Sequence, residues 1–243
     1  AHLTVVQFSE RFKAEMIPLG NKFSYFCAAM PLTDEDTREY LNEPLAAIPP
    51  AIVNLLPKIA ICLVPFIERT NGKTGDHVVA FERPPENREA AYVRVTGDDC
   101  VTLLFGVQDR EVADYHYFFY RALAELVADR IPPEAETKYF GRLREELGNR
   151  VHGEVDEASW RLKQALARRQ SSFRRESKGF REYAVQSFID TLTLYMHGLC
   201  CDIDIDTGPR QVPSRHLRKR LDLLRSLFPP PEGYALFPEE ARG

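Results

Sequence analysis

The sequence lacks the short motifs that identify several large classes of enzyme. It contains no GxSxG segment, so a serine or cysteine nucleophile elbow is absent. It also contains no P-loop and no GxGxxG segment, and nucleotide binding therefore has no positive support.

Cysteine is scarce, and its arrangement is irregular. The five cysteines are Cys27, Cys62, Cys100, Cys200 and Cys201. Their odd number and the absence of a CxxC pair indicate neither a disulfide framework nor a zinc knuckle. We therefore expect reduced, mostly buried thiols in a cytoplasmic protein.

Long hydrophobic runs and an excess of one charge are also missing. The longest apolar stretch, 59–67, is interrupted by Pro65 and is too short to span a membrane. No basic region followed by an apolar run is visible at the N-terminus, so we expect no signal peptide. The net charge is only -4, so we expect neither a membrane nor a nucleic-acid partner.

The remaining composition is typical of a soluble globular protein. Of the 243 residues, 44% are hydrophobic and 28% are charged. This length fits one large domain or two small ones, and we expect a single domain over 1–243. Within it we expect a mixed α/β portion at 1–108 and a helical portion at 109–243.

The first portion alternates short apolar segments with turn signals. Strands are predicted for 58–67, 78–82, 91–96 and 100–105. Short helices are predicted for 3–16, 33–42 and 51–56. These elements predict a small N-terminal sheet, either antiparallel or mixed.

The second portion has helical periodicity interrupted by proline and glycine. Helices are predicted for 109–131, 133–148, 154–176, 180–197 and 215–228. Gly198 is the predicted C-terminal cap of the fourth of these helices. The fold class is therefore α+β, with the small N-terminal sheet followed by a mainly helical C-terminal bundle.

The segment Tyr-His-Tyr-Phe-Phe-Tyr at 115–120 lies early in the first long helix. A zinc peptidase of the zincin type has His-Glu-x-x-His on such a helix, because two His one turn apart reach the same ion. Here Tyr117 occupies the Glu position and Tyr120 the position of the second His. The general base and one metal ligand are therefore absent.

A second segment, Phe-Arg-Glu-Tyr-Ala-Val-Gln-Ser-Phe at 180–188, resembles the gluzincin helix that carries the third zinc ligand. Together with the order of elements over about 58–197, it is similar to a degenerate zincin scaffold. The resemblance implies His116 as the first His, Glu182 as the third ligand and a scaffold that has lost hydrolysis. Alternatively, His116 is an ordinary helix histidine, and 180–188 is an ordinary amphipathic helix.

Another candidate site lies at 150–157, Arg-Val-His-Gly-Glu-Val-Asp-Glu. His152, Glu154 and Asp156 could bind a divalent metal from a loop at a helix start, and His197 could join them. The alternative is that the carboxylates favour the positive end of a helix dipole. His197 is then a routine residue of a last helical turn.

Two runs of basic residues, 161–181 and 215–225, offer a third interpretation. Either could contact phosphates. Because aromatic residues between them are sparse and the whole chain is acidic, we favour solvated helix faces that pair with acidic segments.

These patterns lead to three functional hypotheses. The leading hypothesis is a non-catalytic, zincin-like scaffold that binds an unknown protein or small molecule and carries no cofactor. The first alternative is a hydrolase dependent on zinc or another divalent metal, using His152, Glu154 and nearby acids. The second alternative is a binder of an anionic ligand or nucleic acid through the Arg-rich helices.

Overall fold

The structure is a computed structural model that describes residues 3–70, 76–168, 177–201 and 210–236. By its internal contacts, the chain forms two compact units. Unit 1 comprises Ala1–Ala46 and Leu55–Ala122, and unit 2 comprises Ala47–Asn54 and Leu123–Gly243. A mixed sheet lies in the first part and helices dominate the second, so the fold is α+β as predicted. The prediction of a single domain stays a prediction.

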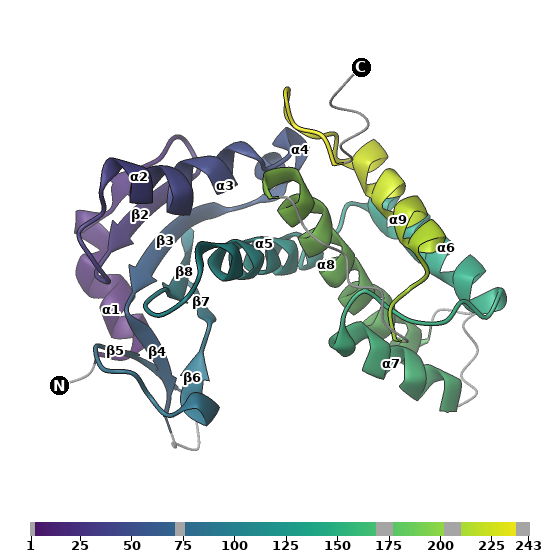
Figure 1. Ribbon diagram of the computed structural model, residues 1–243, viewed down its shortest axis with the longest axis horizontal. Helices are drawn as coiled ribbons and strands as arrows, with labels where there is room; N and C mark the ends of the chain where they lie inside the picture. The colour runs from purple at the N-terminus through teal and green to yellow at the C-terminus, as the bar shows by residue number, and fades with distance from the viewer. Residues whose placement is uncertain (1–2, 71–75, 169–176, 202–209, 237–243) are drawn as a thin grey trace. The chain divides into compact units, whose positions relative to one another are not determined.

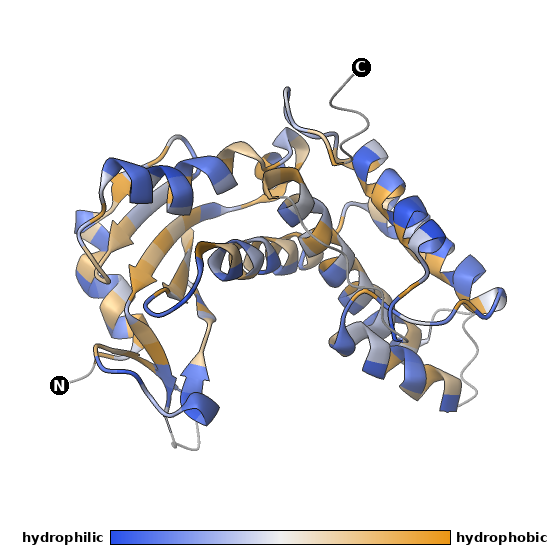
Figure 2. Ribbon diagram, viewed as in Figure 1, coloured by the Kyte–Doolittle hydropathy of each residue, from blue (hydrophilic) through white to orange (hydrophobic). Residues whose placement is uncertain are grey.

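The main sheet of unit 1 has the strand order β1-β2-β3-β8-β7 (Figure 1). Its strands are β1 (Ile17–Pro18), β2 (Phe23–Cys27), β3 (Lys58–Val64), β7 (Tyr92–Thr96) and β8 (Cys100–Gly106). The three inner strands are parallel, with Ile61 opposite both Tyr25 and Leu103, whereas the two edge strands pair antiparallel. β3 is hydrophobic and buried along almost its whole length (Figure 2), as expected for an inner parallel strand.

Pro65 divides the predicted strand 58–67 between two sheets. β3 ends at Val64, and β4 (Phe66–Arg69) begins a second, antiparallel sheet of order β5-β4-β6. Its other strands are β5 (His77–Ala80) and β6 (Glu89–Ala90). Because proline has no backbone N–H to donate to a sheet, a change of partner sheet at this residue is favourable.

Helix α1 (Val5–Phe12) packs against the strands of unit 1 and is shorter than the predicted helix 3–16. A capping box formed by Thr4 and Gln7 begins the helix, and the 3₁₀ turn η1 (Lys13–Glu15) follows it. Val5 and Phe8 belong to a buried cluster that also contains Cys62 and Leu104. The apolar side of α1 therefore completes the core of unit 1.

The chain between β2 and β3 forms a series of short helices, because a parallel strand pair requires a long crossover. The elements are α2 (Asp34–Thr37), the π-helical turn η2 (Arg38–Asn42), α3 (Glu43–Ala46) and α4 (Pro50–Leu55). Another 3₁₀ turn, η3 (Glu86–Arg88), precedes β6. The β7–β8 hairpin closes at Gly97, whose N–H donates to the Cys100 carbonyl oxygen at 3.0 Å.

Unit 2 is helical. After α5 (Val112–Ala128), in which the division between the units falls, it contains α6 (Pro133–Gly148), α7 (Glu157–Arg168), α8 (Lys178–Cys200) and α9 (Ser214–Leu227) (Figure 1). α8 contacts α6, α7 and α9. One face of α8 is apolar and lies in the core, since Tyr183, Phe188, Leu192 and Tyr195 are all fully buried.

Gly198 does not end α8, which continues to Cys200. Leu199 is buried, so its packing favours a further helical turn despite the modest cost of a helical glycine. The helix predicted for 154–176 begins only at Glu157 and is described as far as Arg168, and 169–176 lies outside the described residues.

All five cysteines are free thiols, and burial raises the pKa of Cys62 to about 12. None of the helices in the described ranges is both long enough and apolar enough to cross a membrane.

Candidate functional site

His116, the first predicted metal ligand, lies in α5 and makes a structural hydrogen bond within unit 1. Its Nε2 lies 2.8 Å from the carbonyl oxygen of Glu39, so this nitrogen carries the proton and donates it. Glu39 belongs to the π-helical turn, in which a carbonyl accepts from the residue five positions on. For Glu39 that residue is Pro44, which has no N–H, so its carbonyl oxygen is open to another donor. One turn further along α5, the Tyr120 hydroxyl donates to the Pro44 carbonyl oxygen at 3.0 Å. These two side chains therefore hold the crossover segment onto α5.

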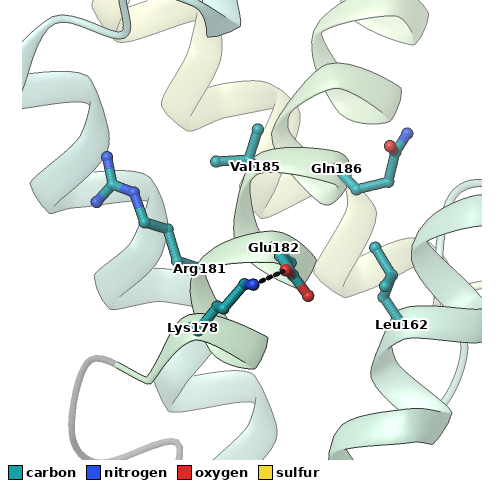
Figure 3. A pocket seen from close by; sticks show the side chains of 6 residues that line it. All are labelled: Leu162, Lys178, Arg181, Glu182, Val185 and Gln186. Atoms are coloured by element: carbon teal, nitrogen blue, oxygen red, sulfur yellow. Dashed lines mark ion pairs between the residues drawn. The ribbon is translucent and has the colours of Figure 1, made fainter.

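Glu182, the other residue of the zincin resemblance, lies at the exposed surface of α8. Its side chain is 54% exposed and lies 3.9 Å from Lys178. Figure 3 shows this pair beside a hollow of about 490 Å³, to which Leu162 of α7 also contributes. Arg181 at the same hollow pairs with Glu136 at 2.6 Å. Its charged groups therefore already have partners, and the zincin hypothesis stays a prediction.

The residues of the second candidate metal site separate into different environments. The His152 ring packs edge-on against Trp160 with centroids 4.9 Å apart, and Asp156 accepts from the Ala158 N–H at 3.1 Å at the start of α7. His197 is half-buried near the C-terminal end of α8. Among the residues described, these three and Glu154 do not bring three ligand atoms within 4.8 Å of one another. The metal-binding hypothesis stays a prediction.

Glu154 has a different environment from the one that its sequence context suggests. Its side chain is fully buried and receives two hydrogen bonds from the guanidinium of Arg220, at 2.7 and 3.0 Å. Arg220 is itself fully buried in α9, and its Nε also donates to Glu146 at 3.0 Å. The run 215–225 was interpreted as a solvated basic face, and for Arg220 this interpretation is wrong.

Lys163 is the second buried cation of this cluster. Its ammonium lies 3.1 Å from Glu154 and donates to the Gly153 carbonyl oxygen at 2.7 Å. Two cations thus balance two carboxylates, which is the condition under which buried charges are tolerated. We call Glu146, Glu154, Lys163 and Arg220 the buried charge cluster.

The pKa values in this cluster follow from its charges. Burial alone would raise the pKa of Glu154, but Arg220, Lys163 and a hydrogen bond from Tyr183 lower it to about 2. Burial lowers the pKa of Lys163, partly opposed by Glu154. At neutral pH, Glu154 is therefore an ionised carboxylate whose oxygens are occupied by internal donors, which disfavours a role as a metal ligand or general base.

Gly153 permits the close approach of two segments beside the cluster. Glu154 and Gln211 form an isolated parallel bridge, and a Cβ on Gly153 would lie only 2.1 Å from the Gln211 carbonyl oxygen. The φ angle of Gly153 is +79°, which a side chain disfavours. Only glycine fits this position without a shift of the backbone.

A surface hollow of about 470 Å³ lies next to the buried charge cluster. We call it the basic hollow, and its lining consists of Asn149, Arg150, Val151, His152, Pro213, Arg215, His216 and Lys219. No acidic residue lines it. Within the described part of the chain, the side chains of Arg150, Arg215 and Lys219 have no hydrogen-bond or ion-pair partner.

Arg150 occupies a backbone conformation that usually selects glycine. Its φ is +54°, and α6 ends in a Schellman motif in which Arg150 and Val151 donate to the carbonyls of Leu147 and Glu146. A side chain at this position costs about 1–2 kcal/mol relative to the right-handed conformation. An arginine therefore stands where the backbone favours glycine, and strained positions of this kind cluster at functional sites.

The N-terminus of α9 forms the opposite wall of the hollow. No side chain caps it, because Pro213 precedes the helix and cannot supply a capping group. The first amides bonded within the helix are those of His216 and Leu217, which both donate to the Pro213 carbonyl oxygen. The unpaired amides and the helix dipole at such an end favour negative charge.

The hollow therefore combines three unpaired cations with an uncapped helix N-terminus, which is a suitable environment for an oxyanion. Sequence analysis placed Arg215 and Lys219 in a basic run but missed Arg150 as their partner. The available signal was Arg150 directly after Gly148-Asn149, where a glycine or asparagine would be expected to end the helix.

No protein-family model matches this sequence, and neither the curated proteins nor the solved structures contain a match.

Proposed function

We propose that the protein has a binding role and that its basic hollow binds an oxyanion, either free or as part of a small molecule. The observation that carries this proposal is the convergence of three cations, Arg150, Arg215 and Lys219, at the uncapped start of α9. Among the described residues, these three side chains have no hydrogen-bond or ion-pair partner. Phosphate and carboxylate groups suit such a site, since cationic side chains and helix N-termini both favour them.

A metal-dependent hydrolase is less well supported by this arrangement. The Glu154 oxygens accept from Lys163, Tyr183 and Arg220, so this carboxylate has little capacity left for an ion. A nucleic-acid face would also need an extended basic surface, whereas Lys163 and Arg220 of the two basic runs are buried. The zincin-like scaffold and the cytoplasmic location stay predictions.

Calorimetric titration with inorganic phosphate and with sulfate tests the proposal. Arg215→Gln and Lys219→Gln each remove one cation from the hollow. Each should lower the affinity for both anions about three- to tenfold, as expected for exposed charge contacts. Added sodium chloride should also lower the affinity for both anions, since salt screens exposed charges. Lys178→Gln is the control, because it removes a cation that lies outside the basic hollow and is 92% exposed.

Arg150→Gly gives the sharpest test, because it separates binding from stability. Glycine relieves the positive φ, so the thermal midpoint should rise while the anion affinity falls. Unchanged affinity in Arg150→Gly, Arg215→Gln and Lys219→Gln would refute the proposal.

A further inference from the structure

The basic hollow and the buried charge cluster meet at His216. This histidine lines the hollow, and its side chain is only 13% exposed. Its Nδ1 lies 4.0 Å from Oε1 of Glu146, which is close enough for charge attraction but too long for a hydrogen bond. His216 therefore connects the hollow to the buried charge cluster.

Glu146 presents an unusual oxygen to this histidine. Its side chain is 98% buried, and Arg220 donates only to Oε2. Oε1 is buried without a hydrogen-bond partner in the part of the chain that the structure describes. A buried carboxylate oxygen without a donor is costly, and such an atom usually marks a missing proton, water or ligand.

Charges on two helices act on the His216 ring. Glu146 on α6 favours the protonated ring, whereas Arg215, Lys219 and Arg220 on α9 oppose it. Arg150 and His152, from the segment between α6 and α7, line the same hollow. Burial and the neighbouring cations outweigh Glu146 and hold the pKa of His216 below its ordinary value, so the ring is neutral at pH 7.

We infer that an oxyanion entering the basic hollow brings a proton onto His216, whose charged ring then donates to the unpartnered Oε1 of Glu146. This inference rests on the proposed function. The anion offsets the positive charge of Arg215 and Lys219, which are two of the cations that disfavour protonation of the ring. The proton comes from solvent, no covalent bond changes, and a doubly protonated ring gains a donor at each nitrogen.

Thermodynamic linkage between proton binding and anion binding determines how the anion affinity changes with pH. If the anion raises the proton affinity of His216, protonation must raise the anion affinity by the same factor. Binding should tighten as the pH falls through the neutral range, by up to about tenfold per pH unit. It should level off below the pKa of the ligand-free ring, where His216 is already charged.

Sulfate is the appropriate probe, because it stays a dianion throughout this range. A phosphate ester instead changes its own charge at about pH 6. Calorimetry of the full chain at pH 7 in two buffers of different ionisation enthalpy measures the protons taken up. The wild type should take up a fraction of one proton per sulfate, and His216→Gln close to none. His77→Gln is the matched control, because it removes a histidine of unit 1 whose pKa is also lowered by burial.

A second measurement does not depend on a substitution. The ring signals of His216 in the wild type, followed by NMR against pH, should show a higher pKa when the protein is saturated with sulfate. Sulfate binding without proton uptake, or with an unchanged His216 titration, overturns the inference and leaves the proposed function intact. Failure of sulfate to bind overturns both, because sulfate binding is itself expected from the proposed function.

Discussion

The guanidinium of Arg220 donates two hydrogen bonds to the carboxylate of Glu154, at 2.7 and 3.0 Å, across 66 positions of sequence. Such a paired arrangement fixes the orientation of both groups, since the donors of arginine match the two carboxylate oxygens. It joins α9 to the segment before α7 in the interior of unit 2.

Replacing Arg220 should therefore strongly destabilise unit 2. Arg220→Met leaves Glu146 and Glu154 buried without their shared cation, and the free energy of unfolding should fall by about 3–5 kcal/mol. Urea denaturation measures this loss. Arg225→Met, on the same helix, breaks a surface pair with Asp222 and should cost less than about 1 kcal/mol. Similar losses in the two variants would contradict the role of the buried charge cluster.

Glu154 should make the protein sensitive to acid. Its pKa is about 2 in the folded protein and about 4.3 in an unfolded chain, so its stabilising effect is complete above about pH 4.3. That effect, about 3 kcal/mol, is lost as the pH falls toward about 2. Urea denaturation between pH 6 and 2.5 should show a steeper decline for the wild type than for Glu154→Gln. The exposed Glu182→Gln should keep the wild-type slope.

Gly153 should tolerate no side chain. The Cβ of Gly153→Ala would lie 2.1 Å from the Gln211 carbonyl oxygen, so the backbone must move and the thermal midpoint should drop sharply. Gly233→Ala has a similar φ of +85° but meets nothing within 4 Å, so it isolates the conformational strain of about 1–2 kcal/mol. Equal effects of the two substitutions would show that the close approach is unimportant.

Phe188 should be a major contributor to the core of unit 2. Its ring is fully buried and meets Tyr139 edge-on, with centroids 5.3 Å apart. Phe188→Ala should cost about 3–5 kcal/mol in urea denaturation, a range typical of buried aromatic truncations. Phe81→Ala serves as the comparison, because that ring is 65% exposed and its loss should change stability by less than about 0.5 kcal/mol. A small effect at Phe188 would contradict its assignment to the core.

Local sequence signals predicted most of the helices and the β7–β8 hairpin, because periodicity, glycine and proline act within a few residues. They missed β2, where Phe23 and Tyr25 are the main indication of a strand, because strand preference depends on neighbours that are distant in sequence. They also placed a single strand across Pro65, since the segment is apolar on both sides of the proline. The separate antiparallel sheet depends on pairing that periodicity does not encode.

The candidate site was less predictable than the fold. The sequence named Glu154 as a candidate metal ligand, whereas its partner Arg220 lies within a run of basic residues that looks solvent-exposed. Burial of one arginine in such a run depends on the packing of α6, α8 and α9, which no local pattern reports. Arg150 and Arg215 come together for the same reason, through contacts between segments about 60 positions apart in sequence.

The long separation between Glu146 and Arg220 has a consequence for biosynthesis. A ribosome releases the chain from its N-terminal end, so α6 and Glu154 emerge well before α9. Until Arg220 follows, the two carboxylates lack the cation that they share, which disfavours their burial in the interior of unit 2. The helices of this unit should therefore remain accessible to chaperones and proteases until the last long helix has left the exit tunnel.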